Sequence, residues 1–158
     1  MLRNMKKFLF LLVFSAFSLN AEQADEEAVL NQLHTYYQTF KTNDVKQVES
    51  FWTEDAELSL PGIGDLEGRE EIAQRMLERF NQNPDGTVHV KSVKVTFPEK
   101  DQAVVTGYIQ FEKNGHMFEQ RAGKIELIKE NGKWLLDDVE ETSSVEGNGK
   151  TLDFPLTK

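Results

Sequence analysis

A tyrosine, a lysine and a group of late carboxylates have the types and positions to handle a polar ligand. Tyr36 lies on the apolar stripe of an expected helix, where its hydroxyl would donate to a ligand carbonyl or hydroxyl. Lys124 lies in an expected strand, and an inward-pointing ammonium there would suit an anionic or carbonyl-bearing ligand. Asp138 is one of four neighbouring acids, and a buried acid of this kind can serve as acid or base. Tyr36 and Lys124 are therefore the candidate catalytic residues.

The same residues also have structural interpretations, and these stay open. Tyr36 can be a core residue whose hydroxyl is satisfied by a neighbour, and Lys124 can lie on a solvated outer face. In the last long strand, strict alternation would put Asp138 on the same face as Trp134 and Leu136. So many acids surround Asp138 that solvated charge is the alternative to acid–base chemistry there.

Several reaction classes lack their residues in this chain. It contains no cysteine, which excludes disulfides, thiol nucleophiles and thiolate metal sites. Its three histidines, His34, His89 and His116, share no short ligand spacing, so no metal site is expected. No Gly-rich phosphate loop, nucleophile elbow or Walker motif occurs, and the sequence shows no cofactor signature.

The first 21 residues have the three parts of a secretory signal peptide. Three basic residues precede an apolar run over residues 8–17, and small residues then allow cleavage after Ser18 or Ala21. The alternative is an uncleaved membrane anchor, but a membrane-spanning helix needs ~20 apolar residues and this run is about half that, which favours the signal peptide. We therefore expect residues 1–21 to be removed during export.

The remaining chain has the size and charge of one acidic domain. It keeps 15 basic against 27 acidic residues, a net charge of −12. That charge repels nucleic acid and argues against binding to anionic membranes. We expect residues 22–142 to form one domain and residues 143–158 to form a polar C-terminal tail. The absence of cysteine fits a periplasmic or secreted bacterial protein.

The helical pattern is strongest over residues 22–41. Val29, Leu33, Tyr36 and Phe40 recur there at steps of four, three and four residues, which predicts an amphipathic helix. Tyr37 comes next to Tyr36 and must point elsewhere, toward a rim or the surface.

Two shorter helices are expected after this one. Residues 42–44 can end the first helix and cap a second, over residues 45–52, whose apolar face includes Trp52. A third helix follows Gly68 and ends before the turn at residues 83–86.

From Thr87 onward the apolar period changes from helical to two, which predicts a meander of strands. A phase slip at Ser92 suggests a β-bulge, and Asn-Gly pairs at residues 114–115 and 131–132 predict hairpin turns. The expected fold class is α+β, with three N-terminal helices covering a curved antiparallel sheet shaped as a cone or half-barrel. The strands are expected at residues 56–60, 87–97, 103–113, 117–129 and 133–140.

Three stretches carry a resemblance to a known superfamily. They are residues 36–56 (YYQTFKTNDVKQVESFWTEDA), 61–72 (PGIGDLEGREEI) and 131–136 (NGKWLL). In this order and spacing they resemble the nuclear transport factor 2-like superfamily, which includes ketosteroid isomerases and SnoaL-like, polyketide-cyclase-like proteins. The resemblance implies a cone-shaped sheet with an internal pocket, and homodimers through the outer sheet face are usual in such families.

The resemblance to ketosteroid isomerases does not extend to their mechanism. Tyr36 falls where their donor tyrosine would be, but Leu60 occupies the position of the base aspartate. Lys124 falls at the position of the second donor. A leucine cannot accept a proton, so only the tyrosine is carried over.

The sequence therefore favours an exported domain that binds a small apolar or carbonyl-bearing molecule without turning it over. One alternative is an isomerase, dehydratase or cyclase that uses Tyr36 with Lys124 or a late-strand carboxylate. Another is a protein-interaction module that forms a homodimer. No cofactor, metal or nucleic acid is expected in any of these. The expected pocket residues are Tyr36, Phe40, Trp52, Leu60, Lys124 and Asp138.

Overall fold

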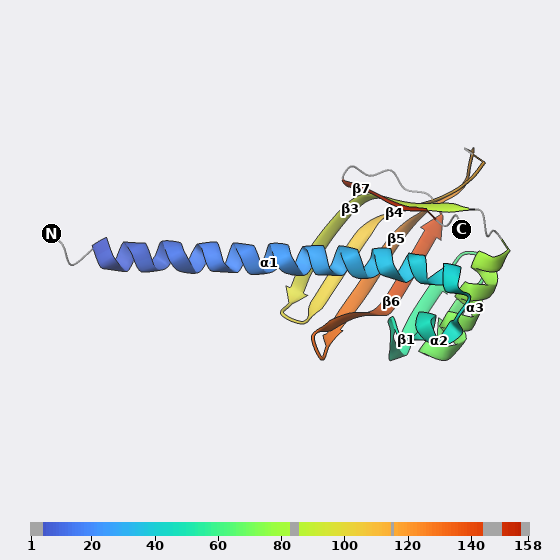
Figure 1. Cartoon of the computed structure of the whole chain (residues 1–158), viewed down its shortest axis with the longest axis horizontal. Coiled ribbons are helices and arrows are strands. Elements are labelled where there is room, and N and C mark those ends of the chain that lie inside the picture. The colour runs from blue at the N-terminus through green and yellow to red at the C-terminus, as the bar shows by residue number, and fades with distance from the viewer. Residues whose placement is uncertain (1–4, 83–85, 115, 144–149, 156–158) are drawn as a thin grey trace.

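One long helix lies across the concave face of a curved sheet (Figure 1). The computed structural model describes residues 5–82, 86–114, 116–143 and 150–155. The helix, α1, runs over Met5–Thr39, so it ends two residues before the expected helix does and continues back through the apolar N-terminal run. Its N-terminal part extends beyond the sheet, and its C-terminal part covers the sheet (Figure 1).

The connection from α1 to the next helix follows the predicted caps. A short 3₁₀ helix, η1 (Phe40–Thr42), ends at Asn43, whose φ of 54° is the left-handed conformation of a helix C-cap. Asp44 then caps α2 (Val45–Glu49), because its carboxylate accepts from two backbone N–H groups at 3.0 and 3.3 Å. The third helix, α3 (Arg69–Asn81), begins directly after Gly68, as expected.

The sheet has seven strands in the order β2-β1-β6-β5-β4-β3-β7. Strands β3 to β6 form the expected antiparallel meander, but β1 pairs in parallel with β6, so the sheet is mixed. β1 also begins at Trp52, four residues before the expected start, and β2 was not predicted. The strands run over β1 Trp52–Leu60, β2 Gly64–Glu67, β3 Thr87–Glu99, β4 Gln102–Lys113, β5 His116–Glu130, β6 Lys133–Ser143 and β7 Lys150–Pro155.

Two local features of the meander, a β-bulge and a hairpin turn, are found where the sequence predicts them. The pairing of β3 with β4 shifts between Lys91 and Lys94, which confirms the bulge expected at Ser92. At the second hairpin Asn131 and Gly132 have φ angles of 50° and 80°, the pair of positive values that a type I′ turn requires.

The C-terminal tail contributes a strand. β7 pairs antiparallel with β3, with Leu152 opposite Val90 and Phe154 opposite Val88. Residues 150–155 therefore complete the sheet instead of forming a wholly polar tail. Residues 144–149, which carry most of the expected polar stretch, lie outside the described residues.

A single apolar core joins α1 to the concave face of the sheet. Val29 and Leu33 of α1 are buried in it with Ile125 of β5 and Leu136 of β6. An ion pair of 2.6 Å between Asp25 and Lys129 ties the covering part of α1 to the β5–β6 hairpin. The expected α+β architecture, a curved sheet covered by helices, is confirmed.

Candidate functional site

Tyr36 lies in the apolar core between α1 and the concave face of the sheet. Its side chain is buried, with only 2% of the residue exposed. Four other rings surround it, with centroids 5.0–5.7 Å from its own. Such edge-to-face and tilted arrangements are the favourable geometry for aromatic groups. The surrounding rings belong to Tyr37, Phe40, Phe51 and Trp52.

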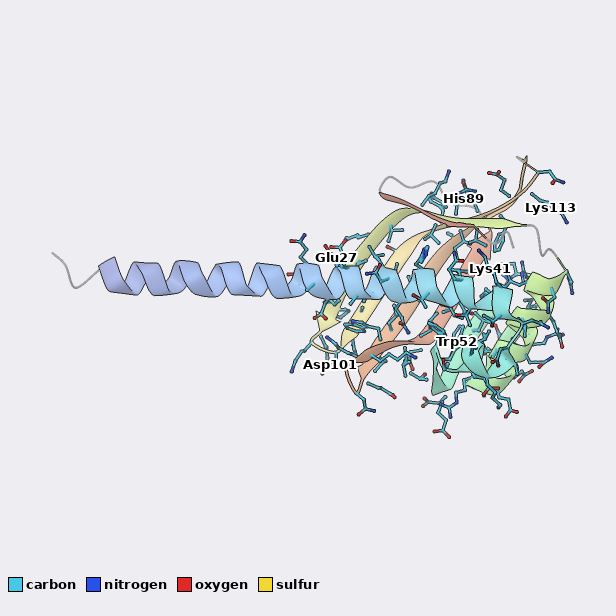
Figure 2. All side chains as sticks on the ribbon, viewed as in Figure 1. Glu27, Lys41, Trp52, His89, Asp101 and Lys113 are labelled. Carbon is cyan, nitrogen blue, oxygen red and sulfur yellow. The ribbon has the colours of Figure 1, made fainter. Side chains whose placement is uncertain are left out.

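The ring of Trp52, on β1, packs against the ring of Tyr36, on α1. It is the first residue of β1 and lies near the C-terminal part of α1 (Figure 2). The two rings are 5.7 Å apart and nearly perpendicular, at 80°. The Tyr36 hydroxyl and the Trp52 indole nitrogen are both shut off from solvent, and neither has a hydrogen-bond partner among the described residues.

The Tyr36 phenol is held in its neutral form. Burial raises its pKa well above the ordinary value, and Tyr37 and Glu141 raise it further. The Trp52 indole N–H acts in the opposite direction on that pKa, but it does not reach full hydrogen-bond geometry with the phenol oxygen. Tyr36 is therefore a hydrogen-bond donor at neutral pH and not a base.

A carboxylate lies on the same inner face. Glu141 of β6 is opposite Gly123 of β5, and among the described residues it is the one charged residue that is buried, 8% exposed. A Cβ built on Gly123 would meet the Ile109 side chain at 3.4 Å and the Glu141 side chain at 3.9 Å. Gly123 thus leaves room for both side chains to lie over the strand. Glu141 also raises the pKa of Tyr37, after the larger effect of burial.

Two of the expected pocket residues are apolar parts of this wall. Phe40 stacks on Phe80 of α3, with centroids 3.9 Å apart and planes at 16°. Leu60, at the end of β1, is 3% exposed and belongs to the same core. Phe40 and Leu60 therefore supply hydrophobic surface and no acid–base chemistry.

The structure does not bring Lys124 to Tyr36. Its neighbour Ile125 is in the core, so Lys124 points to the outer face of the sheet. There its ammonium pairs with Glu126, and 43% of its side chain is exposed. The expectation that Lys124 lines the pocket or assists Tyr36 is wrong, because strand alternation turns it to solvent.

Asp138 is also on the outer face. The pairing of β5 with β6 shifts between Glu126 and Leu127, which leaves Asp137 as an extra residue on β6. The hydroxyl of Thr53 donates to Asp137 at 2.7 Å and holds this bulge. Because of the bulge, Leu136 points to the inner face of the sheet and Asp138 to the outer face. The predictions that Asp138 shares a face with Leu136 and that it lines the pocket are therefore both wrong.

The outer position explains the titration of Asp138. Partial burial raises its pKa, and the neighbouring carboxylates of Glu140 and Glu126 raise it further. Lys124 lowers it by a smaller amount. This cluster belongs to the sheet surface and is separated from Tyr36 by the sheet itself.

Among the described residues, no group of three or more histidines or acids is placed to hold a metal ion. His34 is exposed on α1, and His89 lies 3.2 Å from Glu112 on the neighbouring strand. A surface groove exists at the start of α3, but it is open and mostly acidic. The groove is lined by Glu54, Glu67, Gly68, Arg69, Glu70, Glu71 and Gln74.

The family assignment follows from the sequence together with this fold. The model of the SnoaL-like domain family matches residues 21–140, about three quarters of the chain. The chain belongs to the SnoaL-like domain family. Among curated proteins, none matches it.

Solved structures agree with this SnoaL-like domain in fold. A Nostoc punctiforme protein of unknown function with a cystatin-like fold superposes with a TM-score of 0.65 at 16% identity, over 78% of this chain and 94% of that one. A candidate scytalone dehydratase from Novosphingobium aromaticivorans gives 0.64 at 17% identity, over 86% and 91%. An NTF2-like protein with a cystatin-like fold from the same species gives 0.64 at 18%, over 90% of each chain. At these identities the likeness establishes the nuclear transport factor 2-like fold alone.

Sequence reasoning missed two members of the inner cluster, the group of buried side chains around Tyr36 that includes Tyr37, Trp52 and Glu141. Tyr37 was expected at a rim, but it is 5% exposed and packs against Tyr36 and Phe80. Glu141 is one of the four neighbouring acids of the last long strand, for which the number of charges favoured solvation, and the bulge at Asp137 turns it inward. The apolar residues Leu136 and Val139, three apart in a strand, were the available signal for that bulge.

Within the described chain, no helix is both long enough and apolar enough to cross a membrane.

Proposed function

We propose that this SnoaL-like domain binds a small, largely apolar molecule that carries a carbonyl oxygen, in the space beneath α1. The observation that supports it is the pair of buried donors on Tyr36 and Trp52, which have no partner among the described residues. A buried polar group left unsatisfied costs about 1–3 kcal/mol. One ligand oxygen placed between them would accept from both donors and reduce that cost.

The chemistry of the wall limits the ligand. The rings around Tyr36 are apolar and close, so they favour a small hydrophobic body. Glu141 puts a negative charge nearby, and this disfavours an anionic ligand. A neutral ketone or aldehyde satisfies all of these conditions.

Cyclohexanone is a suitable probe for this proposal. Its binding to the purified domain can be measured by ligand-observed NMR titration. The Tyr36→Phe variant should bind it about tenfold more weakly, which is the size of one hydrogen bond to a buried donor. Tyr108→Phe is the matched control, because Tyr108 lies on the other side of β4 from the core residue Ile109. Equal affinity for wild type and Tyr36→Phe would rule out the proposed role of Tyr36.

A second candidate function is proton transfer next to a carbonyl group. The observation that favours it is the buried Glu141, close enough to raise the pKa of both tyrosines. Glu141 would take a proton from the carbon beside the carbonyl, while Tyr36 donates a hydrogen bond to the oxygen that gains negative charge. Return of the proton to another carbon would complete an isomerisation.

Deuterium exchange separates binding from this chemistry. In D₂O, an active domain should accelerate exchange of the protons beside the carbonyl of cyclohexanone, and Glu141→Gln should remove the acceleration. An uncatalysed exchange rate with the wild-type domain would leave ligand binding as the function and exclude proton transfer on this probe.

We also propose that the domain is exported, on the basis of its N-terminal basic, apolar and small-residue segments. N-terminal sequencing of the protein from a bacterial periplasmic fraction should begin at Leu19 or Glu22. A sample that begins at Met1 would contradict this proposal.

The outer sheet face supports a further proposal, a homodimer. Lys91 and Lys94 of β3 point outward on one side, whereas Glu126, Asp138 and Glu140 lie on the other. A two-fold axis that lies in the interface and runs parallel to the strands would place each lysine side over the acidic side of a second copy. Light scattering should give a dimer that dissociates as salt is raised, and a monomer at every concentration would contradict it.

A further inference from the structure

A third buried donor lies one helical turn before Tyr36. Gln32 precedes it by four residues on α1, and side chains four apart on a helix are neighbours on one face. The amide nitrogen of Gln32 is shut off from solvent, although part of the residue is exposed. Within the part of the chain that the structure describes, this nitrogen has no hydrogen-bond partner.

The position of Gln32 along α1 places it over the sheet. Asp25, seven residues earlier, is tied to Lys129 of the β5–β6 hairpin. Tyr36, four residues later, lies against Trp52 at the start of β1. Gln32 is therefore between two residues of the same helix that both contact the sheet.

The indole of Trp134 adds a fourth donor near the Asp25 end. Trp134 is opposite Lys129, whose ammonium lies 5.1 Å from the ring centroid, and its indole nitrogen is buried without a partner among the described residues. An indole nitrogen can only donate.

We propose that Gln32 forms a second polar subsite, so that the preferred ligand is a neutral molecule with two oxygen acceptors at opposite ends. One oxygen accepts from Tyr36 and Trp52, and the other accepts from the Gln32 amide. The inference rests on the proposed carbonyl-binding function and specifies the class of ligand for that site.

Small cyclic ketones provide a matched pair of probes. 1,4-Cyclohexanedione has the ring of cyclohexanone with a second carbonyl at the opposite end, so the two differ mainly by one acceptor. The wild-type domain should bind the diketone about tenfold more tightly, because one more buried donor becomes satisfied. Ligand-observed NMR titration of both compounds measures this ratio.

Variants of Gln32 test the assignment to that side chain. Gln32→Met keeps the length without polar hydrogen, and Gln32→Glu keeps the shape but cannot donate when ionised. Each should reduce the ratio to about one, because the second carbonyl of the diketone then has no donor. Gln47→Met, on the exposed side of α2, is the control and should preserve the preference. Far-UV circular dichroism checks that every variant is folded.

The outcomes separate this inference from the proposed function. If the wild type binds both ketones equally, or if Gln32→Met keeps the preference, the second subsite is wrong and the single carbonyl site stands. If neither ketone binds to the wild type, the proposed function fails and the second subsite fails with it.

Discussion

The two tyrosines on α1, Tyr36 and Tyr37, have higher pKa values than ordinary phenols because both are buried and both are affected by the carboxylate of Glu141. Burial is the main cause that raises the pKa of Tyr36 and of Tyr37, and Glu141 contributes to both. A neutral phenol in an apolar setting donates a strong hydrogen bond but cannot act as a base. This chemistry favours recognition of an oxygen acceptor at the site.

The raised pKa values of Tyr36 and Tyr37 predict that the folded protein loses stability at alkaline pH. In the unfolded chain these phenols release protons near pH 10, whereas the folded protein holds them. The stabilisation is therefore complete below pH 10 and falls as pH rises further. In a Tyr108→Phe background, absorbance at 295 nm should show both phenols ionising together with unfolding. Ionisation of either phenol near pH 10 in a folded protein would contradict their burial.

Tyr36→Phe should separate binding from stability. The hydroxyl is buried without a partner among the described residues, so removing it relieves a desolvation cost. Urea denaturation should show unfolding free energy unchanged or raised by up to about 1 kcal/mol, even as ketone binding weakens. A loss of more than about 1 kcal/mol would show that the hydroxyl has a stabilising partner.

At the scale of elements, the predictable features are those with a local cause. Asp44 caps α2 through two bonds to backbone N–H groups near it in the chain, and the Asn131-Gly132 turn needs only its own two φ angles. The parallel pairing of β1 with β6 joins Leu58 to Val139, far apart in sequence, and no local pattern specifies it. The sequence therefore predicted the helices and hairpins better than the sheet order.

The error at Lys124 and the error at Asp138 have different causes. Lys124 was assigned by counting from a related family, although strand alternation beside Ile125 already favoured the outer face. Asp138 was misplaced because one extra residue, Asp137, reverses the direction of every side chain after it. Recognising the inner cluster required that bulge.

The outer-face acids make a prediction for the sheet. Asp138 is paired directly with Glu57 on one side and Glu126 on the other, and like charges opposite one another are destabilising. Since the pKa of Asp138 is raised, its ionisation opposes folding as pH rises above its unfolded value near 4. Asp138→Asn should stabilise the domain at pH 7 by roughly 0.5 kcal/mol. Urea denaturation should show that gain shrinking in high salt and at pH 3, and a loss at pH 7 would contradict it.

Removal of β7 tests whether this strand stabilises the folded domain. Truncation after Ser143 would expose the edge of β3 at Val88 and Val90, which β7 pairs with in the intact chain. We expect a melting temperature lower by several degrees and greater aggregation on heating, since about 1 kcal/mol shifts a domain of this size by a few degrees. An unchanged melting curve would mean that the tail is dispensable, as a polar extension would be.

At the scale of the whole molecule, the fold class was accessible because many weak signals agree. The order of helices, the change of period at Thr87 and the two hairpins together specify a curved sheet covered by a helix. The SnoaL-like family match over residues 21–140 supports the same assignment. Function was less accessible, because the inner cluster joins α1, β1 and β6 and depends on one bulge.

The most direct test of carbonyl binding uses the indole N–H signals of the two tryptophans in a ¹H–¹⁵N spectrum. Trp52→Phe assigns the two signals. If a ligand oxygen accepts from Trp52, titration with cyclohexanone should move the Trp52 signal downfield, and Tyr36→Phe should shift it less at the same concentration. A Trp52 signal that stays fixed while the ketone saturates the protein would show that the ligand binds elsewhere, and the site beneath α1 would be wrong.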